Sequence, residues 1–225
     1  MRFIRILLAA LAAVSIMGIT SAAEVAPVLG QDYMALVPAQ STEAGKKVEV
    51  IEFFAYYCPH CLALESPLSA WVKKQGDKII FKRVHVSYNG EPMAQQKLYY
   101  TLESMGKTDE YQSKVFFAMH FQHHRFAEDS EIIDYMVNDL GMDRGKFTSV
   151  YNSTAVQAKV DHALQLMGSY QIQSWPEIVI DGKFTTSPTI AGKRMPVYEE
   201  SGAHTLMLKV LDALVDMQSR ERAKK

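Results

Sequence analysis

Two cysteines, the only ones in the 225-residue chain, lie three positions apart in the run Cys58-Pro59-His60-Cys61. A disulfide that closes so short a loop removes little chain entropy, so this pair is a poor structural staple. The thiolate is the reactive form of cysteine, and His60 can stabilise it at Cys58 by a hydrogen bond or a positive charge. The spacing therefore predicts a disulfide that is made and broken, which is the chemistry of thiol–disulfide exchange.

Half of a zinc site is the other interpretation of two cysteines at this spacing. Structural zinc generally requires four protein ligands, and the sequence has no second such motif and no Cys/His pair close to it. Three histidines between positions 120 and 124 have helical spacings that could bind a metal, although such side chains are more often solvated or capping groups. We therefore predict no metal and no cofactor. A metal carrier remains an alternative, which would use Cys58, His60 and Cys61.

The segment that follows the first cysteine must position the pair. From Cys58 to about Lys74 the apolar residues recur with helical spacing, and Pro59 suits the first position of a helix because the amide there needs no intrahelical partner. Helix starts favour negative charge, so we expect them to stabilise a thiolate at Cys58 and to make the oxidised pair a strong oxidant. Cys61 lies one turn further on. We expect it to be buried and to resolve a mixed disulfide formed at Cys58.

The segment 47–54 is rich in β-branched and aromatic residues and predicts a buried central strand. Glu52 interrupts it, six residues before the first cysteine. Because its neighbours are apolar, we expect it to be buried, with a raised pKa that lets it pass a proton to or from a nearby thiol. The alternative is a surface glutamate. A second strand, residues 79–86, carries Lys82 and Arg83, either of which could supply the countercharge.

The rest of the chain predicts a helical block and a return to the sheet. Residues 88–152 read as a string of short helices, and a longer helix follows over 154–170. Trp175-Pro176 precedes a strand, and Asp181-Gly182 between two β-prone runs is a strong hairpin signal. A final amphipathic helix spans about 201–220.

This order of elements predicts an α/β chain with a thioredoxin-like fold and a helical insertion domain. Its predicted divisions are a signal peptide (1–23), an extended, polar N-terminal arm (24–46), a thioredoxin-like domain (47–87 and 153–225) and an inserted helical domain (88–152).

The first 23 residues have the pattern of a secretory signal peptide. Arg2 and Arg5 precede an apolar run that ends at about Ile19, and small residues up to Ala23 fit a cleavage site. The run is shorter than the roughly 18 residues or more that a membrane span needs, although an uncleaved anchor is the alternative. With 24 Lys and Arg against 25 Asp and Glu, the chain lacks the basic excess of a nucleic-acid binder. We expect an exported, soluble protein with no nucleic-acid partner.

One stretch of the chain reads Glu52-Phe-Phe-Ala-Tyr-Tyr-Cys-Pro-His-Cys61. It resembles the active site of the DsbA family of periplasmic disulfide oxidases, and the similarity extends to Val84-His85-Val86, the helical insertion, the proline before the hairpin and the terminal helix. The resemblance implies that Cys58 is the exposed nucleophile, Cys61 its partner and His60 the main tuner of the redox potential. It also implies that Glu52 is the buried acid.

In the resemblance, Pro176 is a cis proline that faces the cysteines, and Pro59, Trp175 and Pro176 contact the substrate. This chain departs from the family at Trp175, where a small or β-branched residue is usual, so that its peptide recognition should differ. It departs again at Arg83, which stands where the family has a lysine beside the buried acid.

The resemblance implies a monomeric periplasmic enzyme that gives its disulfide to reduced, newly exported polypeptides. A DsbB-like membrane protein linked to quinone would reoxidise it. A reductase or isomerase of the same fold is the alternative activity.

Overall fold

The computed structural model describes residues 26–224, so the predicted signal peptide (1–23) and its cleavage position lie outside the described residues. None of the helices within that range combines the length and the apolar character that a membrane span requires.

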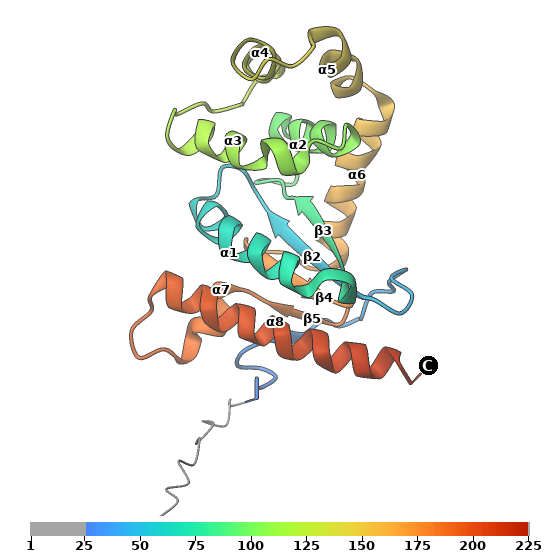
Figure 1. Cartoon of the computed structure of the whole chain (residues 1–225), viewed down its shortest axis with the longest axis vertical. Coiled ribbons are helices and arrows are strands. Elements are labelled where there is room, and N and C mark those ends of the chain that lie inside the picture. The colour runs from blue at the N-terminus through green and yellow to red at the C-terminus, as the bar shows by residue number, and fades with distance from the viewer. Residues whose placement is uncertain (1–25, 225) are drawn as a thin grey trace, which may run out of the picture.

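A five-stranded mixed sheet forms the centre of the fold (Figure 1). Its order is β1-β5-β4-β2-β3, with β2 parallel to β3 and antiparallel to β4. Every residue of β2 is buried, as expected for a central strand that is covered on both faces. The strands are β1 (Met34–Ala35), β2 (Val48–Phe54), β3 (Ile79–His85), β4 (Glu177–Ile180) and β5 (Phe184–Thr186).

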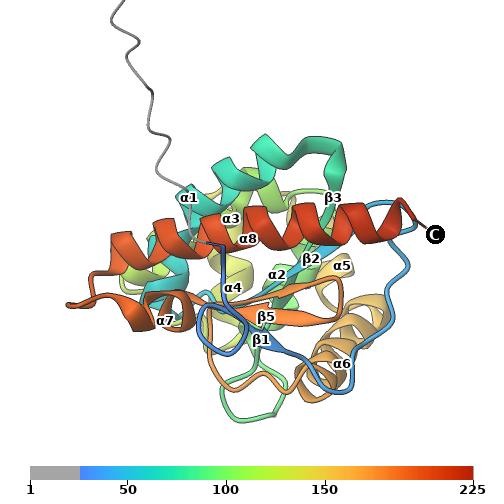
Figure 2. The ribbon, with the colours of Figure 1, turned by 90° about the horizontal axis from the view of Figure 1, so that it is seen from below.

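Two long helices cover one face of this sheet. They are α1 (Pro59–Gln75) and α8 (Glu200–Arg222), which lie side by side and begin at the same end of the molecule (Figures 1 and 2). Leucines of α1 and α8 pack against Val48 and Val50 of β2 in one apolar cluster. Because α1 follows β2 after only four residues, this packing fixes the start of α1 at the end of the central strand.

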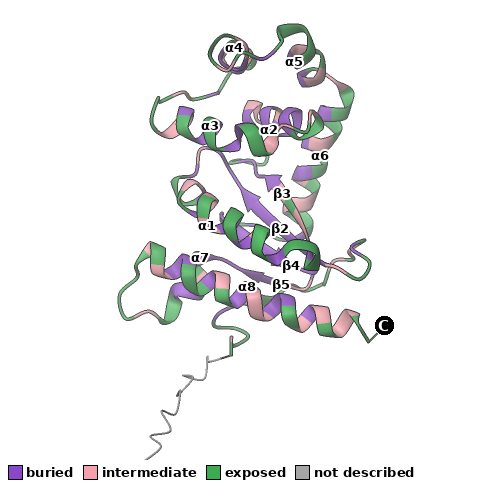
Figure 3. Cartoon of the chain, viewed as in Figure 1, coloured by how far each residue is buried: buried purple, intermediate pink, exposed green. Residues whose placement is uncertain are grey.

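The helical block lies beyond the other side of the sheet (Figure 1). A second apolar cluster, which includes Ile51 and Phe53 of β2, joins it to the sheet, and buried residues run continuously through both regions (Figure 3). The helices are α2 (Ala94–Ser104), α3 (Thr108–His120), α4 (Asp129–Asp134) followed by a π-helical turn (Tyr135–Asp139), α5 (Arg144–Tyr151) and α6 (Thr154–Ser169). They agree with the sequence prediction except that one predicted helix is divided into α4 and the π-helical turn.

The N-terminal arm contains a short strand and a buried side chain that were not predicted from the sequence. Residues Met34 and Ala35 form β1, which pairs with β5 at the edge of the sheet, and Leu36 is buried. A two-residue strand is too short to produce a recognisable alternation, which is why the sequence did not reveal it. The single-turn helix α7 (Pro188–Ala191) was also not predicted, because its 4 residues are too few to show a helical period.

The predicted hairpin between β4 and β5 turns at Asp181 and Gly182, both of which have positive φ. Two such residues are what a tight hairpin turn of this kind requires. The Gly182 carbonyl also accepts the N–H of Gln40 at 2.8 Å, and a Cβ at Gly182 would collide with the Gln40 carbonyl. The turn therefore holds the N-terminal arm against the sheet.

Candidate active site

Cys58 is the residue that caps the start of α1. It has extended backbone geometry, Pro59 follows as the first helical residue, and the backbone N–H of Cys61 donates to Cys58 Sγ at 3.4 Å. The sulfur thus takes the place that a serine or aspartate oxygen usually has at a helix N-terminus. Both thiols are free, so the structure represents the reduced pair.

The two thiols have opposite electrostatic environments. The pKa of Cys58 is lowered to about 6, chiefly by the hydrogen bond with the Cys61 thiol; burial opposes this, and the backbone N–H groups of Cys61 and His60 and the charge of His60 add to the lowering. Burial is the main cause that raises the pKa of Cys61, which has no exposed surface. At neutral pH the first sulfur is therefore mostly a thiolate and the second a thiol.

Cys58 itself is less open than the family resemblance implied. Only 5% of its surface is exposed, which corrects the expectation of an exposed nucleophile. The loop before β4 covers it: Cys58 Sγ lies 3.6 Å from the backbone carbonyl of Trp175, and the Trp175–Pro176 peptide bond is cis, as the resemblance implied. A substrate must reach the sulfur beside this loop.

Three aromatic rings stand in a row next to Cys58. The Trp175 ring meets the Tyr57 ring edge-to-face with 6.1 Å between centroids, and Tyr57 meets Tyr88 in the same way at 6.2 Å. Trp175 is half-buried and Tyr88 is 75% exposed. This aromatic row (Tyr57, Tyr88 and Trp175) brings together residues from three separate parts of the chain. Of the three, only Trp175 was predicted from the sequence to contact the substrate.

From the sequence we expected either a hydrogen bond or a positive charge from His60 toward Cys58; the charge acts on Cys58, whereas the imidazole hydrogen bond goes elsewhere. His60 Nδ1 lies 2.6 Å from Oε1 of Glu200, the first residue of α8. The hydrogen bond with Glu200 is the main cause that raises the pKa of His60. Glu200 is separated from His60 by 140 residues, so no local pattern could have linked them.

Glu52 is buried, as predicted, and it pairs with Arg83. Arg83 Nε donates to Glu52 Oε2 at 2.7 Å, whereas Lys82 pairs with Glu49 at 2.5 Å, so the choice between the two cations falls on Arg83. Burial raises the pKa of Glu52 to about 7, although the charge of Arg83 opposes the rise. This carboxyl group can therefore gain or lose a proton near neutral pH.

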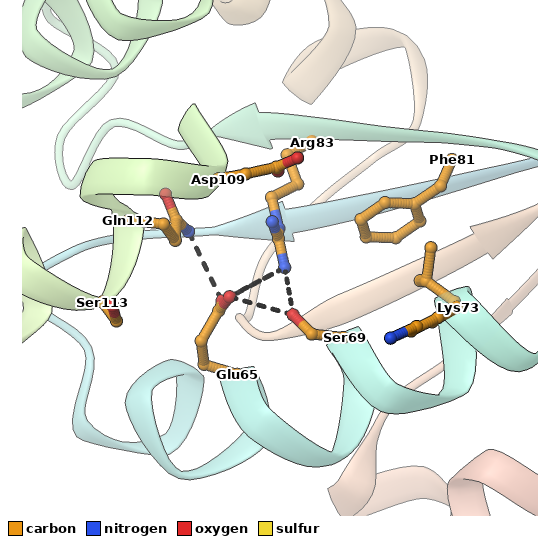
Figure 4. Close-up of a pocket in the computed structure, with 9 residues that line it drawn as sticks. Glu65, Ser69, Lys73, Phe81, Arg83, Asp109, Gln112 and Ser113 are labelled. Atoms are coloured by element: carbon orange, nitrogen blue, oxygen red, sulfur yellow. Dashed lines mark hydrogen bonds and ion pairs between the residues drawn. The ribbon is translucent and has the colours of Figure 1, made fainter. Parts of the chain in front are cut away.

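Arg83 also borders a pocket of about 440 Å³ between α1, β3 and α3 (Figure 4). There its guanidinium donates to both oxygens of Glu65, and Glu65 in turn contacts Gln112 of α3 (Figure 4). Glu52 is itself closed to solvent, but its partner Arg83 is within reach of the pocket. Arg83 thus joins the buried Glu52 to Glu65 at the edge of the pocket.

The loop that carries the cysteines is held through Tyr56. Its backbone N–H donates to His85 Nε2 at 3.1 Å, while its carbonyl lies 2.8 Å from His120 Nε2. The Tyr56 hydroxyl donates to Gln112 at 2.8 Å. Burial lowers the pKa of His85 to about 3, so this imidazole is neutral, and with Nδ1 donating to the Val86 carbonyl, Nε2 is free to accept. Side chains of β3 and α3 thus fix the loop from two sides.

His120 therefore has a structural contact, and His124 lies 3.4 Å from Glu131 and stacks on Phe126. Within residues 26–224 no group of three or more His, Cys, Asp or Glu side chains is arranged to hold a metal ion.

Comparison with known proteins shows which family this chain resembles. The model of the DSBA-like thioredoxin domain matches residues 49–198. The thiol:disulfide interchange protein DsbA of Burkholderia cepacia is 37% identical over 172 residues, which are 76% of this chain and 81% of that protein. The protein of the same name from Pseudomonas aeruginosa PAO1 is 32% identical over 220 residues, 98% of either chain.

The fold of a solved structure leads to the same family as the sequence relatives. The crystal structure of Pseudomonas aeruginosa DsbA has a TM-score of 0.74 to this chain at 29% identity, and the match covers 88% of this chain and 97% of that one. The predicted thioredoxin-like α/β fold and the predicted family are thereby confirmed. With a family match over more than half of its length and a relative aligned almost from end to end, the chain belongs to the DsbA-like thioredoxin domain family.

Proposed function

We propose that this thiol:disulfide oxidoreductase works as a disulfide oxidase, with Cys58 as the sulfur that substrates attack and Cys61 as its redox partner. One observation carries the assignment: Cys58 Sγ caps α1 and accepts hydrogen bonds that favour its thiolate, which lowers its pKa to about 6. A stabilised thiolate is a good leaving group, and a pair whose reduced form is stabilised is a strong oxidant.

The first step starts from the oxidised pair. A substrate thiolate attacks Cys58 Sγ, a new sulfur–sulfur bond forms, and the Cys58–Cys61 bond breaks with its electron pair going to Cys61. Cys61 then takes up a proton, because burial raises its pKa. We assign the supply of that proton to Glu52, whose pKa of about 7 lets it act as an acid at neutral pH.

In the second step another thiolate of the substrate attacks the substrate sulfur of the mixed disulfide. The bond to Cys58 breaks, and Cys58 leaves as the thiolate that the start of α1 stabilises. Two electrons have then moved from the substrate dithiol to the enzyme. In the reverse direction Cys61 resolves the same mixed disulfide. His60 tunes the equilibrium between the oxidised and reduced pair, since its charge is among the influences that lower the Cys58 pKa.

We assign the substrate-binding surface to Pro59, which follows Cys58 in the chain, and to Trp175 and Pro176 of the loop that covers the sulfur. The Trp175 carbonyl lies 3.6 Å from Cys58 Sγ, so a chain that reaches the sulfur passes along this loop. The aromatic row at Trp175 then presents large apolar rings to the residues that flank the substrate cysteine.

The cellular setting follows from the activity. Reduced, newly exported polypeptides are the proposed substrates, and the predicted signal peptide with cleavage after Ala23 supports a periplasmic location. We assign the enzyme to act there as a monomer. Each turnover leaves the enzyme with two extra electrons. We assign their removal to a DsbB-like membrane protein linked to quinone.

Equilibration with glutathione, followed by trapping of the free thiols, tests the oxidase assignment. The expected Cys58–Cys61 pair is much more oxidising than the glutathione couple, and a Cys58→Ala variant transfers no disulfide. With glutathione disulfide as the reactant, a Cys61→Ser variant should accumulate a mixed disulfide between Cys58 and glutathione, because it has no second thiol to resolve it. A potential near or below the glutathione couple would instead indicate a reductase or isomerase.

A further inference from the structure

Glu200 is the first residue of α8, and its carboxylate is not used to cap that helix. The preceding residue, Glu199, does this: its side chain accepts the backbone N–H groups of Ser201 and Gly202. Since α1 and α8 begin at the same end of the molecule (Figures 1 and 2), Glu200 is free to face the start of α1. Its Oε1 lies 2.6 Å from Nδ1 of His60.

His60 is the second residue of α1 and lies two positions after Cys58. The titratable groups that interact with it are Cys58 on its own loop, and Glu200 and His204 on α8; Glu199 interacts with His204. His204 is buried, and its Nε2 lies 3.9 Å from Glu200 without a hydrogen-bond partner in the described chain. Glu200 therefore lies between two imidazoles and is hydrogen-bonded to only one, His60.

We propose that Glu200 is a positioning residue for the redox pair, which holds the His60 imidazole beside the start of α1 and keeps it positively charged. The inference rests on the proposed function and adds a residue that sets the oxidising strength of the Cys58–Cys61 pair. Glu200 acts through His60: the imidazolium favours the Cys58 thiolate, and the carboxylate favours the imidazolium.

An isolated histidine has a pKa of about 6.5 and is mostly neutral at pH 7. The Glu200 hydrogen bond and charge raise the pKa of His60, so the ring carries its charge at pH values where Cys58 ionises. His60 and Glu200 are 64% and 38% exposed, and solvent screens such a pair, so the effect on Cys58 is modest.

The test replaces the carboxylate with a neutral amide in Glu200→Gln and follows the ultraviolet absorbance of the Cys58 thiolate with pH in the reduced protein. We expect the Cys58 pKa to rise by about half a unit, which is about a threefold smaller ratio of thiolate to thiol. Asp216→Asn removes the same charge from α8 at a residue paired with Lys78 at 3.7 Å, and it should leave the titration unchanged.

The same substitution in a His60→Gln background separates a positioning role from a merely structural one. If Glu200 acts through His60, Glu200→Gln causes no further shift there. An equal shift in both backgrounds, or no shift in either, overturns the inference. The titration needs neither substrate nor glutathione. A wild-type potential near the glutathione couple would therefore refute the oxidase assignment without refuting the role of Glu200.

Discussion

Arg83 Nε lies 2.7 Å from Glu52 Oε2, and the two residues face each other in the register of the parallel strands β2 and β3. Both side chains are almost wholly enclosed. Although the cation is at hydrogen-bond distance, burial outweighs it and the pKa of Glu52 is raised to about 7. The ionised pair therefore costs free energy, as buried ion pairs often do.

Glu52→Gln should reveal this cost as a pH dependence of stability. In the folded protein the Glu52 pKa is about 7, above its ordinary value of 4.5, so ionisation of Glu52 destabilises the fold as pH rises. The destabilisation is absent below about pH 4.5 and complete above about pH 7. Between those values the wild type should lose up to roughly 3 kcal/mol relative to the variant. Urea unfolding of both proteins at pH 4, 6 and 8 measures it. A difference that stays constant with pH would contradict the prediction.

The reactivity of Cys58 should follow its lowered pKa. In the reduced protein, the rate of alkylation by iodoacetamide should rise through pH 6 and level off near pH 7, because the thiolate is then fully formed. Cys61 should stay unmodified over this range, since burial raises its pKa and hides it from the reagent. A peptide with an ordinary cysteine, whose pKa is about 8.5, serves as the reference. A profile like that of the peptide would refute the assignment of Cys58 as the activated sulfur.

Trp175→Val should change which peptides the enzyme prefers. The variant removes the ring that packs edge-to-face on Tyr57, and contacts between aromatic rings contribute about 0.5–1.5 kcal/mol. For a peptide with an aromatic residue next to its cysteine, the second-order rate of oxidation should fall by roughly 2- to 12-fold. For the matched peptide with glycine at that position, it should change little. Equal losses for both peptides would mean that Trp175 only shapes the loop.

Gly182→Ala should destabilise the protein by more than about 2 kcal/mol, since the residue has positive φ and its added Cβ would meet the Gln40 carbonyl. Gly168→Ala is the matched control. Gly168 lies in α6 with no atom within 4 Å of its added Cβ, so the same change there should stabilise by about 0.4–1 kcal/mol. Thermal melts of the two variants compare them directly. Similar melting temperatures would show that the N-terminal arm is not fixed at this turn.

The sequence alone predicts the parts of the site that depend on local pattern. The cysteine spacing and the helix-start position of Pro59 identify the redox pair, and a carboxylate inside an apolar strand identifies Glu52 as buried. Trp175-Pro176 is recognisable because a proline stands directly before a strand. In each case the informative residues are neighbours in the chain.

The rest depends on contacts between distant segments, which no local pattern encodes. Glu200 reads in the sequence as an ordinary acidic residue at a helix start, and only the parallel run of α1 and α8 brings it to His60. Tyr56 is held by His85 and His120, and the sequence predicted for His120 a solvated or capping group rather than this contact. Likewise, the cover that the Trp175 loop provides over the first sulfur appears only once the sheet has formed.

The cap that Cys58 Sγ provides for α1 has a thermodynamic consequence for the protein itself. Its strength comes from the negative sulfur, and a sulfur in a disulfide carries no charge, so the stabilisation belongs to the reduced form. Because the pKa of Cys58 is lowered in the folded protein, this stabilisation is complete above the ordinary thiol pKa of about 8.5. It is lost as the pH falls through about 6. In neutral solution the reduced protein should melt at a higher temperature than the oxidised one. The difference in melting temperature between the reduced and oxidised proteins, measured by calorimetry without any second reactant, would thus report the oxidising strength of the pair. Each time the enzyme donates its disulfide, it changes to the more stable reduced form.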